Sequence, residues 1–245
     1  MAQHRFAPVE RKPAYAQVFE SIENEILSGR LEDGAAMPTE MELCRQFGVQ
    51  RSTVREGVRL LEQSGLVRRV NGKRLVVARP RIDEAAENTR RGLERFGARF
   101  IDVWEAISTI LTATARLAAD KVGEDDLAAL AQITRDLTEA RDEAEVVANA
   151  VSYIQQFGAA TGNEIIAVLV RSLSLLTKAS LERVINDLPR ARKRIEQAQR
   201  EINAALKDGD QERAMRWVER HVDDLKRGYD YAGVDLETEV GMFGR

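Results

Sequence analysis

Residues 38–66 read PTEMELCRQFGVQRSTVREGVRLLEQSGL, and this stretch decides the fold of the N-terminal part of the chain. Thr39 and Glu42 have the spacing of a capping box, in which each side chain accepts a hydrogen bond from a backbone N–H at a helix start. Gly48 is suited to end that helix. A second helix is predicted over residues 51–64. Two short helices joined by a tight glycine turn indicate a helix-turn-helix.

The second predicted helix has an apolar face and a basic face. Val54, Val58 and Leu61 recur at helical spacing and are expected to pack inward. Arginine can hold guanine through two hydrogen bonds, and hydroxyl groups can hold phosphates. The outward face is therefore suited to the major groove of DNA, and it carries Arg51, Ser52, Arg55 and Arg59.

A β-hairpin is predicted directly after these helices. Residues 66–68 favour one strand and residues 74–77 the return strand. Between them, Asn71 and Gly72 suit a two-residue type I′ turn, in which both residues have positive φ. Lys73 and Arg74 would then lie at the tip of a wing, against the DNA backbone or the minor groove.

Positive charge is concentrated in this region. Residues 45–79 contain nine Arg or Lys residues against two acidic residues, a net charge of +7, whereas the whole chain has −3. The remainder therefore carries −10. A basic module on an acidic protein indicates binding to a polyanion, here double-stranded DNA. Taken one by one, the same arginines would equally fit a solvated helix face.

Length and composition fit an ordinary folded protein. The chain has 245 residues, 44% hydrophobic and 31% charged, enough for two domains or one large domain. No apolar run approaches the ~18 residues of a membrane span, and residues 1–17 lack the apolar core of a signal peptide. We therefore expect a cytoplasmic protein without a membrane partner. The single cysteine, Cys44, excludes an internal disulfide and is expected to be a small buried hydrophobe.

The fold class expected is mainly α, a winged helix-turn-helix followed by an all-helical bundle. A first helix starts at Pro13 and stops at Gly29, and Pro80 ends the return strand. After Asp83 helical periodicity takes over, with helices predicted at 84–97, 100–121, 124–141, 144–161, 164–186, 189–208 and 210–230. The predicted parts are an arm (1–12), a winged-helix domain (13–79), a linker (80–87), an all-α domain (88–235) and a tail (236–245).

Residues 13–79 resemble the winged-helix domain of GntR-type bacterial transcription regulators. The resemblance rests on Pro38-Thr39-Glu40, Gly48-Val49, the run from Arg51 to Arg55, Leu60-Leu61 and Gly65-Leu66. It implies that Arg51, Ser52, Thr53 and Arg55 contact an operator, with Glu40 at the preceding helix start and Gly72 at the wing tip. Together with the basic residues, the candidate DNA-binding set is Glu40, Arg45, Arg51, Ser52, Thr53, Arg55, Arg59, Gly72, Lys73 and Arg74.

The helical half resembles the FadR subfamily, whose effector domain is all-α. The residues concerned are 115–119, 160–163 and 209–210 with Ala214 and His221. The resemblance implies a homodimer that binds a short palindromic operator, usually as a repressor, and a small-molecule effector inside the bundle.

Many subfamily members bind a divalent metal there through one Asp and three His. The matching positions here are Ala150, Ile154, Gln199 and His221, and three of these four cannot serve as ordinary metal ligands. We therefore expect no metal and no other cofactor, and His221 is expected to be a hydrogen-bonded core or pocket residue. An Arg that meets effector carboxylates in relatives would align near Ile107.

An apolar pocket lining favours an apolar effector such as a fatty acyl-CoA, as in the fatty-acid-responsive branch. The candidate effector-binding residues are Trp104, Ile107, Leu111, Ala150, Ile154, Phe157, Gln199, Trp217 and His221. Two alternatives stay open. The effector could be a small organic acid. The bundle could be solid, which would give a constitutive DNA binder. An enzyme is not expected, because one cysteine and two histidines supply no nucleophile–base pair.

Overall fold

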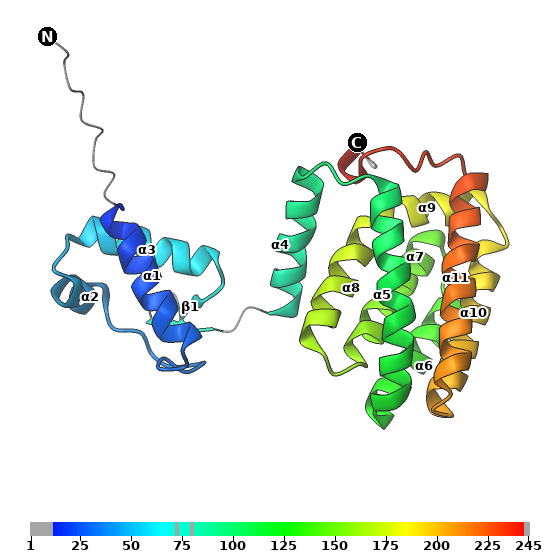
Figure 1. Cartoon of the computed structure of the whole chain (residues 1–245), viewed down its shortest axis with the longest axis horizontal. Helices are drawn as coiled ribbons and strands as arrows, with labels where there is room; N and C mark the ends of the chain where they lie inside the picture. Colours follow the sequence, from blue (N-terminus) through cyan, green and yellow to red (C-terminus); the bar gives the residue numbers. More distant parts are fainter. Residues whose placement is uncertain (1–11, 72–73, 79–80, 243–245) are drawn as a thin grey trace, which may run out of the picture. The chain divides into compact units, whose positions relative to one another are not determined.

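A computed structural model describes residues 12–71, 74–78 and 81–242. Within it the chain forms two compact units, one ending at Arg81 and the other beginning at Ile82 (Figure 1). The expected combination of a winged helix-turn-helix with an all-helical bundle is confirmed. Residues 1–11 of the predicted arm lie outside the described residues. No described helix is long and apolar enough to cross a membrane.

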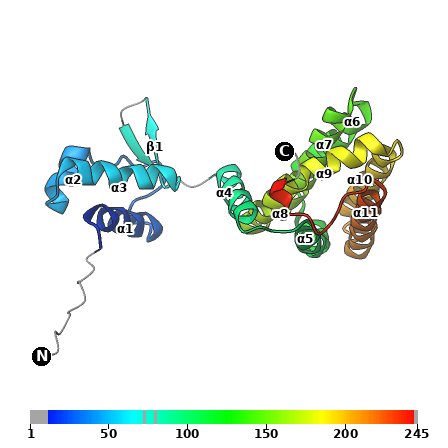
Figure 2. The ribbon, with the colours of Figure 1, turned by 90° about the horizontal axis from the view of Figure 1, so that it is seen from above.

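The N-terminal unit consists of three helices and an antiparallel hairpin. α1 (Ala14–Leu27) and the hairpin lie on opposite sides of α3 (Arg51–Gln63) in Figure 2. The core side chains of α3 are Val54, Val58 and Leu61, each at most 1% exposed. α1 packs so closely on α3 that a Cβ added at Gly57 would lie 2.9 Å from Val18 Cγ1. The elements are α1 (Ala14–Leu27), α2 (Glu40–Phe47), α3 (Arg51–Gln63), β1 (Val67–Val70) and β2 (Arg74–Val77).

The predicted signals at the ends of α2 are confirmed. Thr39 Oγ1 accepts a hydrogen bond from Glu42 N at 3.2 Å, and Glu42 Oε2 accepts one from Thr39 N at 2.7 Å. Gly48 follows with a φ of 64°, a left-handed conformation that favours glycine. Cys44, which was expected to be buried, is only half-buried.

The hairpin differs from the prediction in register. Val70 pairs with Arg74, so three residues rather than two separate the paired ends, and the strand extends to Val70. Asn71 has the expected positive φ, 51°, while Gly72 and Lys73 lie outside the described residues. Residues 34–37 add a third extended stretch along β2, through hydrogen bonds such as Met37 N to Leu75 O at 2.9 Å.

The C-terminal unit is a helical bundle around the long helix α5. α5 packs against α11, α8, α10 and α7, and Figure 1 shows α8 and α11 on either side of it. The helices are α4 (Ile82–Arg95), α5 (Phe100–Lys121), α6 (Glu124–Glu139), α7 (Glu143–Ala159), α8 (Glu164–Leu176), α9 (Lys178–Asp187), α10 (Ala191–Lys207) and α11 (Gln211–Tyr231), followed by a 3₁₀ turn (Val240–Met242).

The single helix predicted over 164–186 is wrong, because α8 ends at Leu176 and α9 starts at Lys178. Hydroxyl side chains around the break hydrogen-bond to backbone carbonyls three or four residues earlier. Examples are Ser172 Oγ to Val168 O at 2.6 Å and Thr177 Oγ1 to Ser174 O at 3.0 Å. Such bonds compete with the helical ladder and bend helices.

The ends of the bundle also differ from the expected boundaries. α4 begins at Ile82, inside the segment expected to be a linker. Residues 236–240, expected to belong to a tail, are hydrogen-bonded to the start of α5, with Phe100 N donating to Thr238 O at 2.9 Å and Ile101 N to Leu236 O at 2.8 Å. A pattern of apolar residues cannot reveal such pairing, because the bonds join backbone groups.

Candidate DNA-binding and effector sites

The first candidate site is the outward face of α3. Its arginines are well exposed, with side-chain exposures of 75% for Arg51, 67% for Arg55 and 51% for Arg59. Ser52 is exposed and Thr53 is half-buried. Because Val54 and Val58 are buried on the opposite face, the helix presents its basic side outward, as the spacing predicted.

Glu40 organises arginines from two elements. Its carboxylate lies 3.1 Å from Arg51 Nε, 4.0 Å from Arg55 Nε and 3.9 Å from a terminal nitrogen of Arg69, and its side chain is 19% exposed. Arg69 in β1 also bonds Glu62, with Nε 2.9 Å from Oε1. The Arg51 contact is a hydrogen bond, whereas those of Arg55 and Arg69 are long ion pairs. The Glu40 carboxylate thus holds Arg51 and attracts the other two guanidinium groups to the same place.

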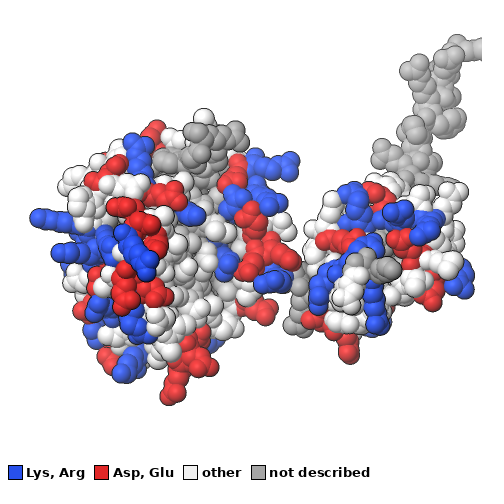
Figure 3. Space-filling model, turned by 180° about the vertical axis from the view of Figure 1, so that it is seen from behind, with Lys and Arg blue, Asp and Glu red and all other residues white. Residues whose placement is uncertain are grey.

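A hollow of about 580 Å³ lies beside this cluster, between the start of α2 and the wing. It brings together Glu40 and Arg51 with Arg74 of the predicted set, and with Arg69, which the sequence reasoning missed. Side chains alternate between faces along a strand, so Arg69 lies on the opposite face of β1 from Arg68 and on the same face as the buried Val67. This alternation could have placed it toward the helices. Figure 3 shows Lys and Arg side chains gathered on one face of this unit, with acidic side chains among them.

Two other predicted residues have different settings. Arg59 forms a two-point contact with Glu56, at 2.6 and 3.1 Å. This hydrogen bonding raises the pKa of Arg59 and lowers the pKa of Glu56. Arg45 is exposed in the last turn of α2. The guanidinium groups of Arg51 and Arg55 have longer contacts than that of Arg59, which leaves them more available to a ligand.

The second candidate site is a central cavity in the bundle. Its volume is about 50 Å³, room for one or two water molecules at ~30 Å³ each and well below the ~300–1,000 Å³ of a typical small-ligand pocket. Six of the nine predicted effector residues line it: Trp104, Ile107, Leu111, Ala150, Ile154 and His221. The sequence reasoning thus brought together the right helices around a space that is nearly filled.

The other three predicted residues do not line this cavity. Phe157 is buried and stacks against Tyr153, with ring centroids 6.3 Å apart. Gln199 is 1% exposed, and its Oε1 has no hydrogen-bond partner among the described groups. Trp217 lies under the guanidinium of Arg220, 4.9 Å from the ring centroid. The cavity lining also includes Ile195 and Leu225, each one helical turn from Gln199 or His221 on the same helix face. The predicted faces therefore point inward, and the cavity lies at a different level along α10 and α11.

His221 is buried without a hydrogen bond from its ring to any described group, which corrects the expectation of a hydrogen-bonded residue. It is 6% exposed. Burial lowers its pKa to about 4, although Asp224 acts in the opposite direction. The imidazole is therefore neutral at pH 7. In the described part of the chain, no three His, Cys, Asp or Glu side chains gather in a way that could hold a metal ion.

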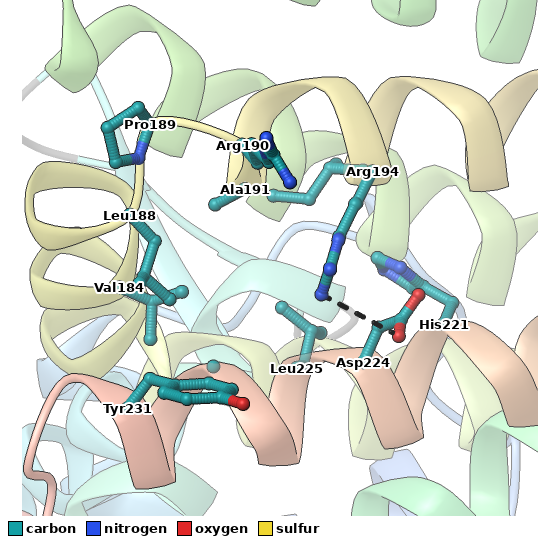
Figure 4. Close-up of a pocket in the computed structure, with 12 residues that line it drawn as sticks. Val184, Leu188, Pro189, Arg190, Ala191, Arg194, His221, Asp224, Leu225 and Tyr231 are labelled. Atoms are coloured by element: carbon teal, nitrogen blue, oxygen red, sulfur yellow. Dashed lines mark ion pairs between the residues drawn. The ribbon is translucent and has the colours of Figure 1, made fainter.

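A larger pocket adjoins the central cavity, and sequence reasoning missed it. It has a volume of about 360 Å³ and lies between α9, α10 and α11 (Figure 4). It shares Ile195, His221 and Leu225 with the central cavity. The full lining is Val184, Leu188, Pro189, Arg190, Ala191, Arg194, Ile195, His221, Asp224, Leu225, Gly228 and Tyr231. Part of it comes from α9, whose separate existence the sequence did not predict.

Comparison with curated proteins finds similar chains among transcription regulators. The HTH-type transcriptional repressor NagR of Bacillus subtilis (strain 168) is 33% identical over 75 residues, 31% of each chain. The Glc operon transcriptional activator of Escherichia coli (strain K12) is 40% identical over 70 residues, 29% of this chain and 28% of the relative. Each of these two matches thus spans less than a third of the relative's length. The regulator Mce2R of Mycobacterium tuberculosis (strain CDC 1551 / Oshkosh) is 30% identical over 138 residues, 56% of this chain and 58% of the relative.

Among solved structures, Streptococcus agalactiae GntR covers 87% of this chain and 99% of its own, with a TM-score of 0.58 and 20% sequence identity. This likeness concerns the fold alone. Two family models match the sequence itself. The model of bacterial regulatory proteins of the gntR family matches residues 14–77, and the FCD domain model matches residues 102–224, half of the chain. The chain therefore belongs to the GntR family of bacterial regulatory proteins, with a C-terminal FCD domain.

Proposed function

We propose that this protein is a ligand-responsive transcription regulator that binds a short palindromic operator as a homodimer. The observation that carries the proposal is the exposed basic face of α3, with Arg51 and Arg55 held by Glu40 beside the basic strand β1. Similar proteins include repressors and an activator, and repression is the proposed direction.

In the proposed complex α3 enters the major groove. Arg51 and Arg55 hydrogen-bond to guanine edges or phosphates, and Ser52 and Thr53 at the helix start hold the DNA backbone. Arg69 and Arg74 on the wing contact phosphates beside the groove. Each neutralised phosphate releases counterions, so operator affinity falls steeply as the salt concentration rises.

The proposed dimer has twofold symmetry, so two copies of α3 read the two halves of the operator. Two heads that bind one face of B-DNA lie about 34 Å apart, one helical turn. The two DNA-binding units of the dimer can adopt an arrangement that fits the operator and one that does not. An effector that binds the FCD domain more tightly in one arrangement shifts the population toward it. Operator affinity changes by the same difference in free energy.

The proposed effector is a largely apolar metabolite, bound without a metal. A fatty acyl-CoA was the first candidate from the apolar lining, but a cavity of about 50 Å³ accepts an acyl chain only if the helices separate. The second candidate is a small organic acid. Arg190 and Arg194 at the adjoining pocket of about 360 Å³ favour this candidate.

The test is a fluorescence anisotropy titration with DNA from upstream of the protein's own gene, comparing the wild type with Arg55→Glu. We expect the substitution to weaken binding about a hundredfold, or ~3 kcal/mol. Arg30→Glu is the matched control, because it makes the same charge change away from α3. Arg30 lies just beyond the end of α1 and pairs with Glu25. Equal operator affinity in wild type and Arg55→Glu would refute the assignment of α3. Size-exclusion chromatography of both variants checks that the dimer is retained.

A further inference from the structure

We propose that the pocket between α9, α10 and α11 binds a small amphipathic anion, with a carboxylate or phosphate head and an apolar body. This inference rests on the proposed function in one respect, because the anion would be the effector of the regulator. The pocket is separate from the central cavity around Ile107 and Ala150, to which the family resemblance points.

Volume is the first argument. The pocket measures about 360 Å³, within the ~300–1,000 Å³ that small ligands occupy. The central cavity measures about 50 Å³. A ligand larger than a few water molecules therefore fits the side pocket without rearrangement of the helices, and it does not fit the centre.

The lining divides into a charged end and an apolar end. Figure 4 shows Arg194, His221 and Asp224 together at one end, and Leu188, Val184 and Tyr231 at the other. Val184 is 2% exposed and forms part of the apolar floor. Such a division matches a molecule with one charged head and one apolar end.

The charged end favours an anion. Arg190 and Arg194 are one turn apart at the start of α10, where the helix dipole also contributes positive potential. Asp224 is the acidic residue of the lining, but it forms a close ion pair with Arg227. Its contact with Arg194 is a longer one, at 4.0 Å. Arg194 can therefore turn to an incoming carboxylate or phosphate while Asp224 keeps Arg227 as its partner.

His221 lies where the two spaces meet. Its side chain lines both the pocket and the central cavity and is 6% exposed. One nitrogen of a neutral imidazole is a hydrogen-bond donor, so the ring can bond to the head group of a ligand at this junction.

The apolar end is shaped by a close approach of two helices. A Cβ added at Gly228 of α11 would lie 2.9 Å from Val184 Cγ1 of α9. The same added Cβ would lie 3.7 Å from Leu188 Cδ1, so a side chain at position 228 would crowd the apolar end. Tyr231 is 79% exposed at the rim, where an aromatic ring can cover the apolar body of a ligand.

The test is isothermal titration calorimetry of the full chain with octanoate, octyl phosphate and the neutral octanamide. We expect at least one anion to bind one site per chain with a dissociation constant of ~1 mM or lower, and octanamide to bind about tenfold more weakly. The tighter anion identifies the head group. No saturable binding of either anion up to ~10 mM, or equal affinity for octanamide, would overturn the proposal.

Three variants locate the binding. Arg194→Gln should weaken the anions about tenfold and leave octanamide unchanged, because it removes charge without changing the floor. Leu188→Trp should weaken all three compounds by filling the apolar end. Arg200→Gln, on the same helix but paired with Glu196, is the matched control and should change nothing. Unchanged anion binding in Arg194→Gln and Leu188→Trp would contradict the assigned site. Circular dichroism checks that each variant is folded.

The DNA titration separates this inference from the proposed function. Arg194→Gln should bind operator DNA like the wild type when no anion is present. If that holds and the anions do not bind, only the pocket assignment is lost. If the anions bind as expected but Arg55→Glu keeps wild-type DNA affinity, the pocket stands and the DNA-binding function falls.

Discussion

The two units differ in how their candidate sites are built. In the N-terminal unit, most of the side chains that would meet a ligand lie on α2 and α3, and their spacing along these helices fixes which way they point, while Arg69 and Arg74 come from the adjoining hairpin. In the C-terminal unit, the candidate pocket takes its lining from α9, α10 and α11, so small shifts of a helix change which residues meet. A local site can be read from sequence, whereas an assembled one depends on packing.

The largest expected effect tests whether the two units are stable on their own. Leu61 in the N-terminal unit and Leu130 in the C-terminal unit are both 0% exposed. Replacing either by alanine should cost ~3 kcal/mol, from lost burial and the cavity left behind. In differential scanning calorimetry, Leu61→Ala should lower the unfolding temperature of the N-terminal unit, and Leu130→Ala should lower that of the C-terminal unit. A single transition that shifts equally in both variants would show that the units unfold together.

A second effect concerns pH and arises from His221 in the C-terminal unit. Burial lowers the pKa of His221 to about 4 from 6.5, so the unfolded chain binds a proton between these pH values that the folded chain does not. Stability is therefore full above pH 6.5 and decreases as the pH falls toward 4. Between pH 7 and pH 5 the loss should be ~2 kcal/mol. Urea unfolding of the wild type and His221→Gln at both pH values checks this, and the variant should lose less.

A third effect concerns the arginine cluster around Glu40. Glu40→Gln removes the shared carboxylate, so Arg51, Arg55 and Arg69 lose a common partner. We expect the ratio of operator affinity to affinity for unrelated DNA to fall about tenfold, or ~1.4 kcal/mol. Binding to unrelated DNA should persist, because arginines without a fixed partner still attract phosphates. Competition titrations measure this ratio. Glu23→Gln on α1 makes the same charge change elsewhere, and a ratio equally altered in both would assign the effect to net charge.

The smallest effect is the loss of one helix cap. Thr39→Ala removes the oxygen that accepts the Glu42 N–H, and such caps contribute ~1 kcal/mol. Only the unfolding temperature of the N-terminal unit should fall. Asp142→Ala, which removes the corresponding bond to Glu145 N at the start of α7, should move only the C-terminal transition. Both measurements use the same calorimetric scans.

Sequence reasoning succeeded where the deciding interactions are local. The Thr39–Glu42 capping box, the glycine turn at Gly48 and the buried face of α3 all depend on residues a few positions apart. It also named six residues that do converge on the central cavity, because one apolar face per helix must point to the core of a bundle.

Sequence reasoning failed where the structure depends on contacts between residues far apart in sequence or on hydrogen bonds from side-chain hydroxyls. The break between α8 and α9 comes from Ser and Thr side chains bonding to backbone carbonyls, which apolar periodicity does not register. The pairing of residues 236–240 with the start of α5 joins backbone atoms far apart in sequence. The missed pocket joins α9, residues 188–190, α10 and α11, so it depends on how separate helices pack, which periodicity along one helix does not show.

The division between Arg81 and Ile82 has a consequence for engineering. Each unit buries its own apolar cluster, with Leu61 in one and Leu130 in the other. A junction placed at this division cuts through neither cluster. Hybrid sensors made by joining this FCD domain to the winged helix of a relative with a known operator would therefore keep both folds, and a reporter gene under that operator would reveal the inducing compound.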